Sequence, residues 1–321
     1  MAMSRVVVTG ANGFVGRALS RTLLADGHVV TGLVRRAGEC VEGVREWVHD
    51  GRDFAGLAEA PWPEVDCVVH LAARVHVMDD AAADRDAAFR ATNVEGSLRA
   101  ADAARRHGAR RFVFVSSIKA LAETDGGRPL REDDPARPDD PYGRSKHEAE
   151  TALRQFGEAC GLDVVIVRPP LVYGPGVRAN FLRMMDAVFR GVPLPLGAIV
   201  ARRSLVYVDN LADALARCAI DPRAARGCFH VADDDPPSVA ALLRMTGEAI
   251  GRPARLLPVP AGVLRTVGRL TGRTAQIERL TGSLQLDTGR IKQVLDWRPP
   301  YTTEQGLVAT AAWYRASNVG N

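Results

Sequence analysis

Tyr142 and Lys146 carry complementary acid–base chemistry four residues apart, in the segment Tyr142-Gly-Arg-Ser-Lys146. If this segment is helical, both side chains lie on one face of the helix. The ammonium group then lowers the pKa of the phenol and orients it as a general acid or base. An isolated Y-x-x-x-K match is commonly a surface tyrosine beside a solvated lysine. Here Pro141 directly precedes the pair and marks a helix start, which favours the catalytic interpretation.

Ser116 and Ser117 could complete this chemistry. They follow residues 111–115, an apolar segment rich in valine and phenylalanine that predicts a strand. At the carboxyl end of a parallel strand, their hydroxyl groups would face the same crevice as Tyr142. Ser117 can hydrogen-bond a carbonyl oxygen while Tyr142 moves its proton and a nicotinamide cofactor transfers hydride.

A glycine turn supplies the expected cofactor site. The valine run at residues 6–8 is followed by G-x-x-G-x-x-G over residues 10–16, and an apolar helical pattern runs from Phe14 to about Leu24. A strand, glycine turn and helix bring backbone N–H groups against a pyrophosphate with no Cβ in the way. The spacing differs from the standard G-x-G-x-x-G fingerprint, but its place between strand and helix predicts a nucleotide cofactor.

Strand-like and helical segments alternate through the first half of the chain. The further candidate strands are residues 28–34, 46–49, 66–71, 111–116 and 162–167, and the candidate helices are residues 84–107 and 141–160. This alternation predicts βαβ units, hence an α/β fold with a doubly wound parallel sheet. Ligands then bind at the carboxyl ends of the strands, where the glycine turn, the serine pair and Tyr142 fall.

The pattern becomes irregular after residue 170. A helix over 210–219 and a strand over 228–231 indicate a return to the sheet, and helices near 238–250, 261–270 and 289–295 indicate a smaller lobe. We therefore predict a dinucleotide-binding domain at 1–169 with return segments at about 204–232. An interleaved substrate lobe would comprise 170–203 and 233–321.

Composition narrows the class of protein. A net charge of +4 without a basic block does not suggest nucleic-acid binding, and no apolar run reaches the ~18 residues of a membrane span. The five cysteines are scattered and lack C-x-x-C spacing, which indicates reduced thiols and no metal site. The first predicted strand leaves no room for a signal peptide, so we expect a cytoplasmic enzyme. Residues 256–270 are apolar but interrupted by prolines and arginines, which favours a surface or lid helix.

Several motifs occur in a specific order: TGANGFVG, HLAA at 70–73, TNVEGS at 92–97, the serine pair, Y-x-x-x-K and RPPLVYGP at 168–175. With them the chain resembles, over nearly its whole length, the extended short-chain dehydrogenase/reductase family. This is the NAD-dependent epimerase/dehydratase group that works on nucleotide sugars. The resemblance implies a Rossmann-type fold, a UDP-sugar substrate and a homodimer paired through the helices at 84–107 and 141–160.

The resemblance also implies individual contacts. The glycine turn would hold the pyrophosphate, Asp50 and Gly51 the adenine, and Asn93 the active-site geometry, while Arg203 would fork onto the substrate diphosphate. Together with Arg35 and Arg36, the expected cofactor-binding residues are Gly10, Asn12, Gly13, Phe14, Val15, Gly16, Asp50, Gly51, Leu71, Ala72, Ala73, Asn93, Ser116, Tyr142, Lys146, Pro169 and Val172. The expected catalytic residues are Ser117, Tyr142 and Lys146, and the expected substrate-binding residues are Ser117, Lys119, Asn180, Leu196, Arg203 and Arg279.

Cofactor choice is expected to depend on the end of the second strand. Val34 stands where family members carry a carboxylate for the ribose diol, and Arg35 and Arg36 follow. Either guanidinium could bind a 2′-phosphate, so we predict NADP(H), with NAD(H) as the alternative if both arginines face solvent.

Three functions compete. A site for NADPH favours net reduction, so we expect a reductase of a UDP-4-keto-6-deoxy-N-acetylhexosamine in surface-polysaccharide precursor synthesis. The alternative is a UDP-hexose 4-epimerase with tightly held NAD. Residues 119–122, Lys-Ala-Leu-Ala, replace the family's V-Y-G segment and hint at a different sugar pocket. A non-catalytic nucleotide sensor would typically have lost Tyr142 or Lys146, and both are present.

Overall fold

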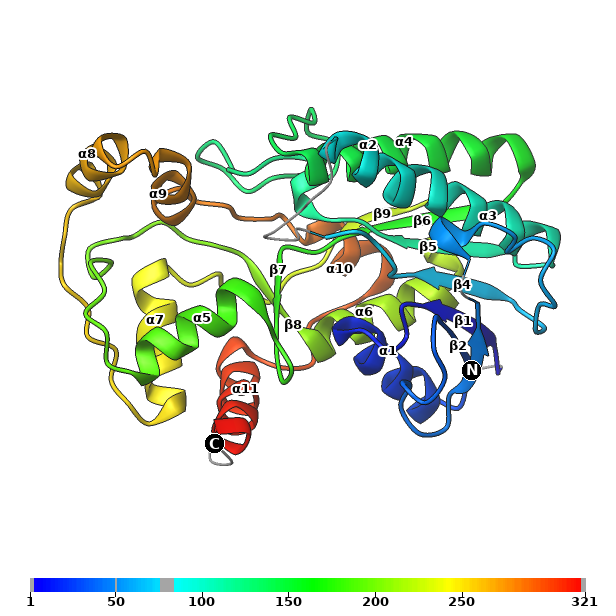
Figure 1. Ribbon diagram of the computed structural model, residues 1–321, viewed down its shortest axis with the longest axis horizontal. Coiled ribbons are helices and arrows are strands. Elements are labelled where there is room, and N and C mark those ends of the chain that lie inside the picture. The colour runs from blue at the N-terminus through cyan, green and yellow to red at the C-terminus, as the bar shows by residue number, and fades with distance from the viewer. Residues whose placement is uncertain (1–2, 50, 76–83, 319–321) are drawn as a thin grey trace.

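The computed structural model describes residues 3–49, 51–75 and 84–318. Its centre is a seven-stranded parallel sheet in the order β3-β2-β1-β4-β5-β6-β9 (Figure 1). The strands are β1 (Arg5–Thr9), β2 (Val29–Val34), β3 (Arg45–Val48), β4 (Cys67–His70), β5 (Arg111–Val115), β6 (Asp163–Arg168) and β9 (Cys228–His230). Strand order reverses at β1, and this confirms the predicted doubly wound α/β fold.

Helices cover both faces of the sheet. α1 (Phe14–Ala25) and α6 (Val208–Ile220) pack on one face, and α3 (Ser97–Arg106) and α4 (Pro141–Cys160) on the other (Figure 1). β1 shows why a continuous valine run suits this position. Val6 and Val8 belong to the apolar core under α1 and α6, and Val7 to the core under α3 and α4. A strand buried on both faces needs no polar alternation.

The helix predicted over residues 84–107 is interrupted. α2 (Arg85–Arg90), capped by the Asp84 carboxylate, passes through a π-helical segment (Ala91–Gly96) into α3. Such widened turns are frequent at functional sites. Here the segment contains Asn93, whose side chain is buried and hydrogen-bonded.

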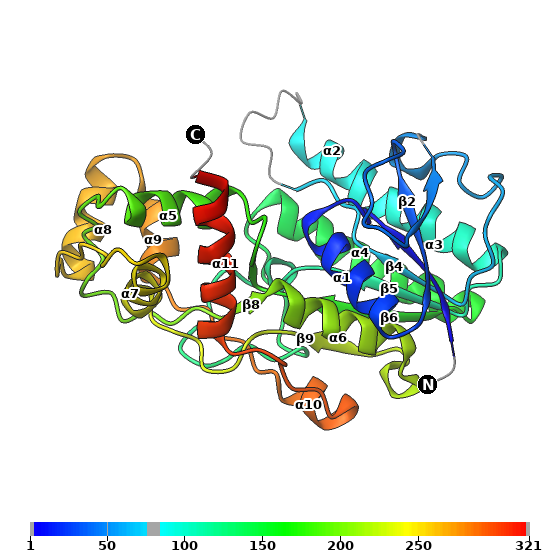
Figure 2. The ribbon, with the colours of Figure 1, turned by 90° about the horizontal axis from the view of Figure 1, so that it is seen from below.

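Residues after 170 build a second group of elements. β7 (Leu171–Tyr173) pairs in parallel with β8 (Leu205–Tyr207), beside α5 (Ala179–Phe189), α7 (Val239–Ile250) and α11 (Thr303–Asn318) (Figure 2). The helices α8 (Ala261–Leu270) and α9 (Thr274–Thr281) pack against each other, farther from the central sheet. In contrast, α10 (Gly289–Leu295) packs beside β9 of that sheet. The elements β7, β8, α5, α9 and α11 were not among those predicted from the sequence. The division into two interleaved domains stays a prediction.

Three short 3₁₀ turns complete the described elements. They are η1 (Arg52–Phe54), η3 (Ile118–Ala120) and η4 (Pro222–Ala224). Among the described residues, no helix has both the length and the apolar character to cross a bilayer.

Candidate active site

A cavity of about 1050 Å³ lies at the carboxyl ends of the central strands. Eight of the residues predicted to bind the cofactor line this cavity: Gly10, Asn12, Gly13, Arg35, Gly51, Leu71, Ala72 and Ala73. The other lining residues are Leu33, Val34, His49, Arg52, Asp53, Phe54, Arg74, Val75, Ala88, Ala91 and Thr92. Its volume and position suit a dinucleotide at a topological switch point.

The glycine turn fits a pyrophosphate. Gly10 has φ +69°, and a Cβ there would lie 3.3 Å from the backbone nitrogen of Ala72. Gly13 is the N-cap of α1 and provides no side-chain cap, so the first N–H groups of the helix remain available to phosphate oxygens. Gly16 does not line the cavity, and its contact with a cofactor stays a prediction. Its Cβ would stand 2.2 Å from the Gly10 carbonyl oxygen, so its absence lets α1 pack against the turn.

The loop after β2 shapes the far end of the cavity. The Arg35 side chain is exposed and lines the cavity, whereas Arg36 is exposed and does not. The Asn12 amide hydrogen-bonds the carboxylate of Glu39 from this loop. Glu46 accepts hydrogen bonds from the backbone of residues 38–40 and holds the loop in place. Asp50 lies outside the described residues.

Asn93 links two parts of the site through side-chain hydrogen bonds, and its role in an active site stays a prediction. Its side chain accepts from the Arg74 N–H (2.8 Å), donates to the Arg74 carbonyl (3.1 Å) and donates to Ser145 Oγ on α4 (2.9 Å). Thr9 Oγ1 similarly accepts from the N–H groups of Leu71 and Ala72. These bonds fix the segment after β4 against both the glycine turn and the helix of Tyr142.

Tyr142 stands in the first turn of α4, within a desolvated environment. It shares a side-chain hydrogen bond with Ser117, and its ring meets Phe89 edge-on with centroids 6.1 Å apart. Burial raises the pKa of Tyr142 to about 12, with a smaller contribution from the negative charge of Asp140. The net pKa of Tyr142 therefore lies above its ordinary value, because desolvation of the phenolate outweighs the lowering that was predicted from Lys146.

Lys146 is buried one helical turn along the same face. Its Nζ donates to the Val115 carbonyl (2.9 Å) and lies 4.5 Å from the centroid of the Phe114 ring. Burial lowers the pKa of Lys146 to about 7, because the ammonium has left water. It can therefore exchange a proton at neutral pH.

The remaining predicted cofactor contacts do not line the cavity. The Ser116 Oγ is buried and has no hydrogen-bond partner among the described residues, so it can accept one from a ligand. The Pro169 carbonyl accepts from the Ile118 N–H (2.9 Å) and supports the turn that carries Ser117. Phe14, Val15 and Val172 are half-buried. Their contacts to a cofactor stay predictions.

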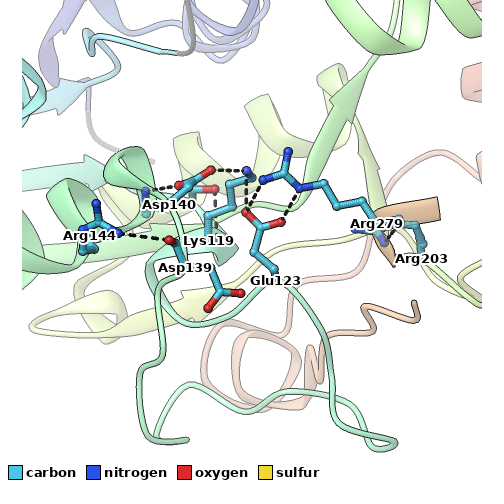
Figure 3. A network of polar contacts seen from close by, with 9 residues as sticks. Lys119, Glu123, Asp139, Asp140, Arg144, Arg203 and Arg279 are labelled. Atoms are coloured by element: carbon cyan, nitrogen blue, oxygen red, sulfur yellow. Dashed lines mark hydrogen bonds and ion pairs between the residues drawn. The ribbon is translucent and has the colours of Figure 1, made fainter. Parts of the chain in front are cut away.

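On the substrate side, charged groups form a chain between two distant segments (Figure 3). Lys119 Nζ contacts Asp140 (2.6 Å) and Glu123 (2.8 Å), and Glu123 also accepts from Arg279 Nε of α9 (3.0 Å). Arg203 donates to the backbone carbonyls of Arg279 and Gly282. The structure thus brings Lys119, Arg203 and Arg279 together. Asn180 is exposed on α5 and Leu196 is half-buried, and their substrate contacts stay predictions.

Sequence reasoning missed part of the cavity wall. His49, Arg52, Phe54, Arg74 and Thr92 line it but were not selected. A usable signal was present for the segments after β3 and β4, since both follow carboxyl ends of parallel strands. For Thr92 the only sequence signal was the motif at residues 92–97, which also contains Asn93.

A parallel sheet, a glycine turn at a switch point and a desolvated Ser-Tyr-Lys constellation together define a dinucleotide-dependent α/β enzyme. Residues 6–230 match the model of the NAD dependent epimerase/dehydratase family. The protein belongs to this family.

Similar proteins cover nearly the whole chain. A "UDP-glucose 4-epimerase" of Vibrio cholerae is 40% identical over 320 residues, which are 98% of this chain and 96% of that protein. Among solved structures, UDP-glucose 4-epimerase from Thermotoga maritima, with UDP-glucose, matches with TM-score 0.77 and 22% identity, over 98% of this chain and 99% of that one. The Thermus thermophilus enzyme in complex with NAD matches with TM-score 0.75 and 24% identity, over 98% and 99%.

Proposed function

We propose that the protein is a UDP-hexose 4-epimerase. The observation that carries this proposal is the 40% identity, over 98% of the chain, to the Vibrio cholerae protein of that name. The arrangement of Ser117, Tyr142 and Lys146 supports it. Epimerisation at C4 requires one group to hold the oxygen on C4 and another to remove and return the proton of that same oxygen.

The roles of the residues follow from their contacts. Ser117, already hydrogen-bonded to Tyr142, holds the oxygen on C4 of the sugar. Tyr142 takes the proton of this hydroxyl and later returns it. Lys146, held by the Val115 carbonyl, supplies positive charge that favours the phenolate. The bound nicotinamide provides the reversible two-electron oxidation of C4. Arg203 and Arg279 are proposed to hold the diphosphate.

The test uses the purified full chain with UDP-glucose and, separately, UDP-N-acetylglucosamine, with no added cofactor. We expect the galacto product of at least one sugar, measured by NMR of the anomeric proton, and no product with Tyr142→Phe. If neither sugar reacts even after NAD is added, the epimerase proposal fails.

A second candidate rests on Arg35. Because Arg35 lines the cavity and Val34 leaves no carboxylate at that position, the site could accept NADPH and reduce a UDP-4-keto-6-deoxy-N-acetylhexosamine. Stoichiometric NADPH oxidation with that sugar, in a protein that leaves UDP-hexoses unchanged, would favour the reductase.

Cofactor preference is a separate prediction. If Arg35 binds a 2′-phosphate, Arg35→Ala should weaken NADPH roughly 10-fold or more, the value of a charged hydrogen bond, and NADH much less. Arg36→Ala is the matched control, because Arg36 does not line the cavity. Fluorescence titration of both cofactors measures this. Equal losses for NADPH and NADH would contradict it.

A further inference from the structure

Lys119 lies between the catalytic helix and the substrate-binding segment. It belongs to the turn η3, two residues after Ser117, and only 28% of its side chain is exposed. Its backbone N–H donates to Ser117 Oγ (3.2 Å), and its Nζ contacts two carboxylates. Both of those carboxylates are about nine-tenths buried. A lysine so placed directs two of its three ammonium donors at buried protein carboxylates, unlike a solvated surface lysine.

The first carboxylate controls the start of α4. Asp140 is the N-cap of this helix, and its Oδ1 accepts from the Gly143 N–H at 2.7 Å. The other oxygen, Oδ2, accepts from Lys119. Asp140 stands two residues before Tyr142, so its negative charge disfavours the phenolate that catalysis requires.

The second carboxylate connects to the other lobe. Glu123 accepts from Lys119 and from Arg279 of α9, as the dashed lines of Figure 3 show. The backbone of Arg279 is also fixed, because its carbonyl oxygen accepts a hydrogen bond from the Arg203 guanidinium. Charges therefore alternate from Asp140 through Lys119 and Glu123 to Arg279.

We propose that Lys119 is a positioning residue for the reaction: it orients Asp140 at the start of α4, neutralises the Asp140 charge beside Tyr142, and links this helix to the substrate lobe through Glu123. The inference rests on the proposed function, since it assigns Lys119 to the service of Tyr142. It also replaces the expectation that Lys119 contacts the sugar directly.

Other charged groups around Tyr142 are arranged differently. They include Arg85, Asp86, Arg90 and Glu95 on the elements packed against α4, Arg144, Lys146, Glu148 and Glu150 on α4 itself, and Arg74 on the segment after β4. Arg144 pairs with Asp86, and Arg90 with Glu95 and Glu148. The negative charge of Asp140 acts directly on Tyr142 and raises its pKa.

The test compares Lys119→Met, Asp140→Asn and the double variant. Asparagine preserves the helix cap, so Asp140→Asn isolates the charge. Lys119→Met should raise the pKa of Tyr142 by about 0.5–1 unit, and Asp140→Asn should lower it by a similar amount. The double variant should return close to wild type, since both charges are gone. Lys119→Arg should preserve the wild-type value.

Two measurements report this pKa. One is the pH dependence of kcat/KM with UDP-glucose, where activity rises as Tyr142 ionises. The other is the ultraviolet absorbance of tyrosinate during titration, taken as the difference from the matching Tyr142→Phe protein, which needs no substrate. Lys292→Met is the control, because this lysine pairs with Asp234 on an exposed part of the surface and should leave the titration unchanged.

Opposite shifts that cancel in the double variant support the proposal. Shifts of equal sign, or none in the tyrosinate titration, overturn it, because loss of packing alone would not reverse on removing a second charge. An enzyme inactive on UDP-glucose whose tyrosinate titration still shows the cancelling shifts would contradict the proposed function and leave the role of Lys119 intact.

Discussion

Burial moves the pKa values of Tyr142 and Lys146 in opposite senses, to about 12 and about 7. At neutral pH the phenol therefore keeps its proton, while the neighbouring amine is close to half protonated. Both shifts arise because the exclusion of water destabilises the charged form of each group, the phenolate of Tyr142 and the ammonium of Lys146. Catalysis therefore requires local stabilisation of the Tyr142 phenolate, by the hydrogen bond with Ser117 and by the positive charge of the Lys146 ammonium.

Removing the phenolic oxygen tests this directly. Tyr142→Phe should lower kcat by roughly 10²–10⁴-fold, the range of general acid–base catalysis. Tyr301→Phe is the control, because Tyr301 is 45% exposed and should keep wild-type turnover. Steady-state epimerisation measures both. A Tyr142→Phe enzyme with near wild-type kcat would remove Tyr142 from the mechanism.

Lys146 gives a pH dependence of stability. Between its folded pKa of about 7 and its ordinary value of 10.5, the unfolded chain holds a proton that the folded chain lacks. The free energy of unfolding therefore rises with pH in this window, and the cost of burying the ammonium is fully present below pH 7.

Comparison with Lys146→Met isolates this effect, since the other titrations are common to both proteins. Relative to the variant, wild type should gain stability as pH rises from about 7 to about 10. Urea unfolding at several pH values measures the difference. A difference that does not vary with pH would show that Lys146 titrates normally.

Tyr142 and Lys146 could be paired from the sequence because their spacing is local, and Ser117 could be added because it follows a strand with a strong signal. The pKa of Tyr142 could not be predicted, because it depends on burial and on the positions of Ser117 and Asp140 around the phenol, which the fold decides. Asn93 was expected to organise the site, but its bonds to Arg74 and Ser145 required the fold.

At the scale of elements, prediction succeeded where signals were local. Valine runs and glycine turns placed the sheet strands, and Pro141 placed the start of α4. α5 was missed because its N-cap residue, Arg178, provides no side-chain cap. α11 had a readable start, since Thr302 and Gln305 exchange capping hydrogen bonds, and the signal was overlooked. β7 and β8 are three residues each and are stabilised by pairing with each other.

The contact between α4 and η3 allows a matched pair of substitutions. A Cβ at Gly143 would lie 2.4 Å from the Lys119 carbonyl oxygen, whereas a Cβ at Gly262 of α8 would meet nothing within 4 Å. Gly143→Ala should cost about 1–3 kcal/mol of stability by overpacking and should also reduce kcat, because Ser117 shifts relative to Tyr142.

Gly262→Ala should instead be neutral or stabilise by up to about 1 kcal/mol, because alanine is the better helix former. Urea unfolding of both variants checks the contrast. Equal effects at the two positions would mean that α4 and η3 separate easily and do not fix the geometry of the site.

At the scale of the whole molecule, the proposed substrate site joins segments far apart in the chain. Arg203 and Arg279 are 76 positions apart, yet Arg203 donates to the Arg279 carbonyl, and Arg279 pairs with Glu123, which follows η3. The resemblance identified both arginines, but their meeting depends on β8 and α9, which sequence patterns did not reveal.

Arg279 offers the prediction that tests this arrangement. Its side chain is 51% exposed and, within the described part of the chain, pairs with the Glu123 carboxylate, so its guanidinium is accessible to an anionic diphosphate. Arg279→Gln should raise KM for the UDP-sugar roughly 10–100-fold, the loss of a charge-assisted hydrogen bond, with a smaller effect on kcat. Arg273→Gln is the control, because Arg273 is exposed at the start of the same helix α9. Steady-state kinetics at constant ionic strength separates the two parameters. If both variants raise KM equally, the effect reflects general charge attraction, and Arg279 has no specific place in the substrate site.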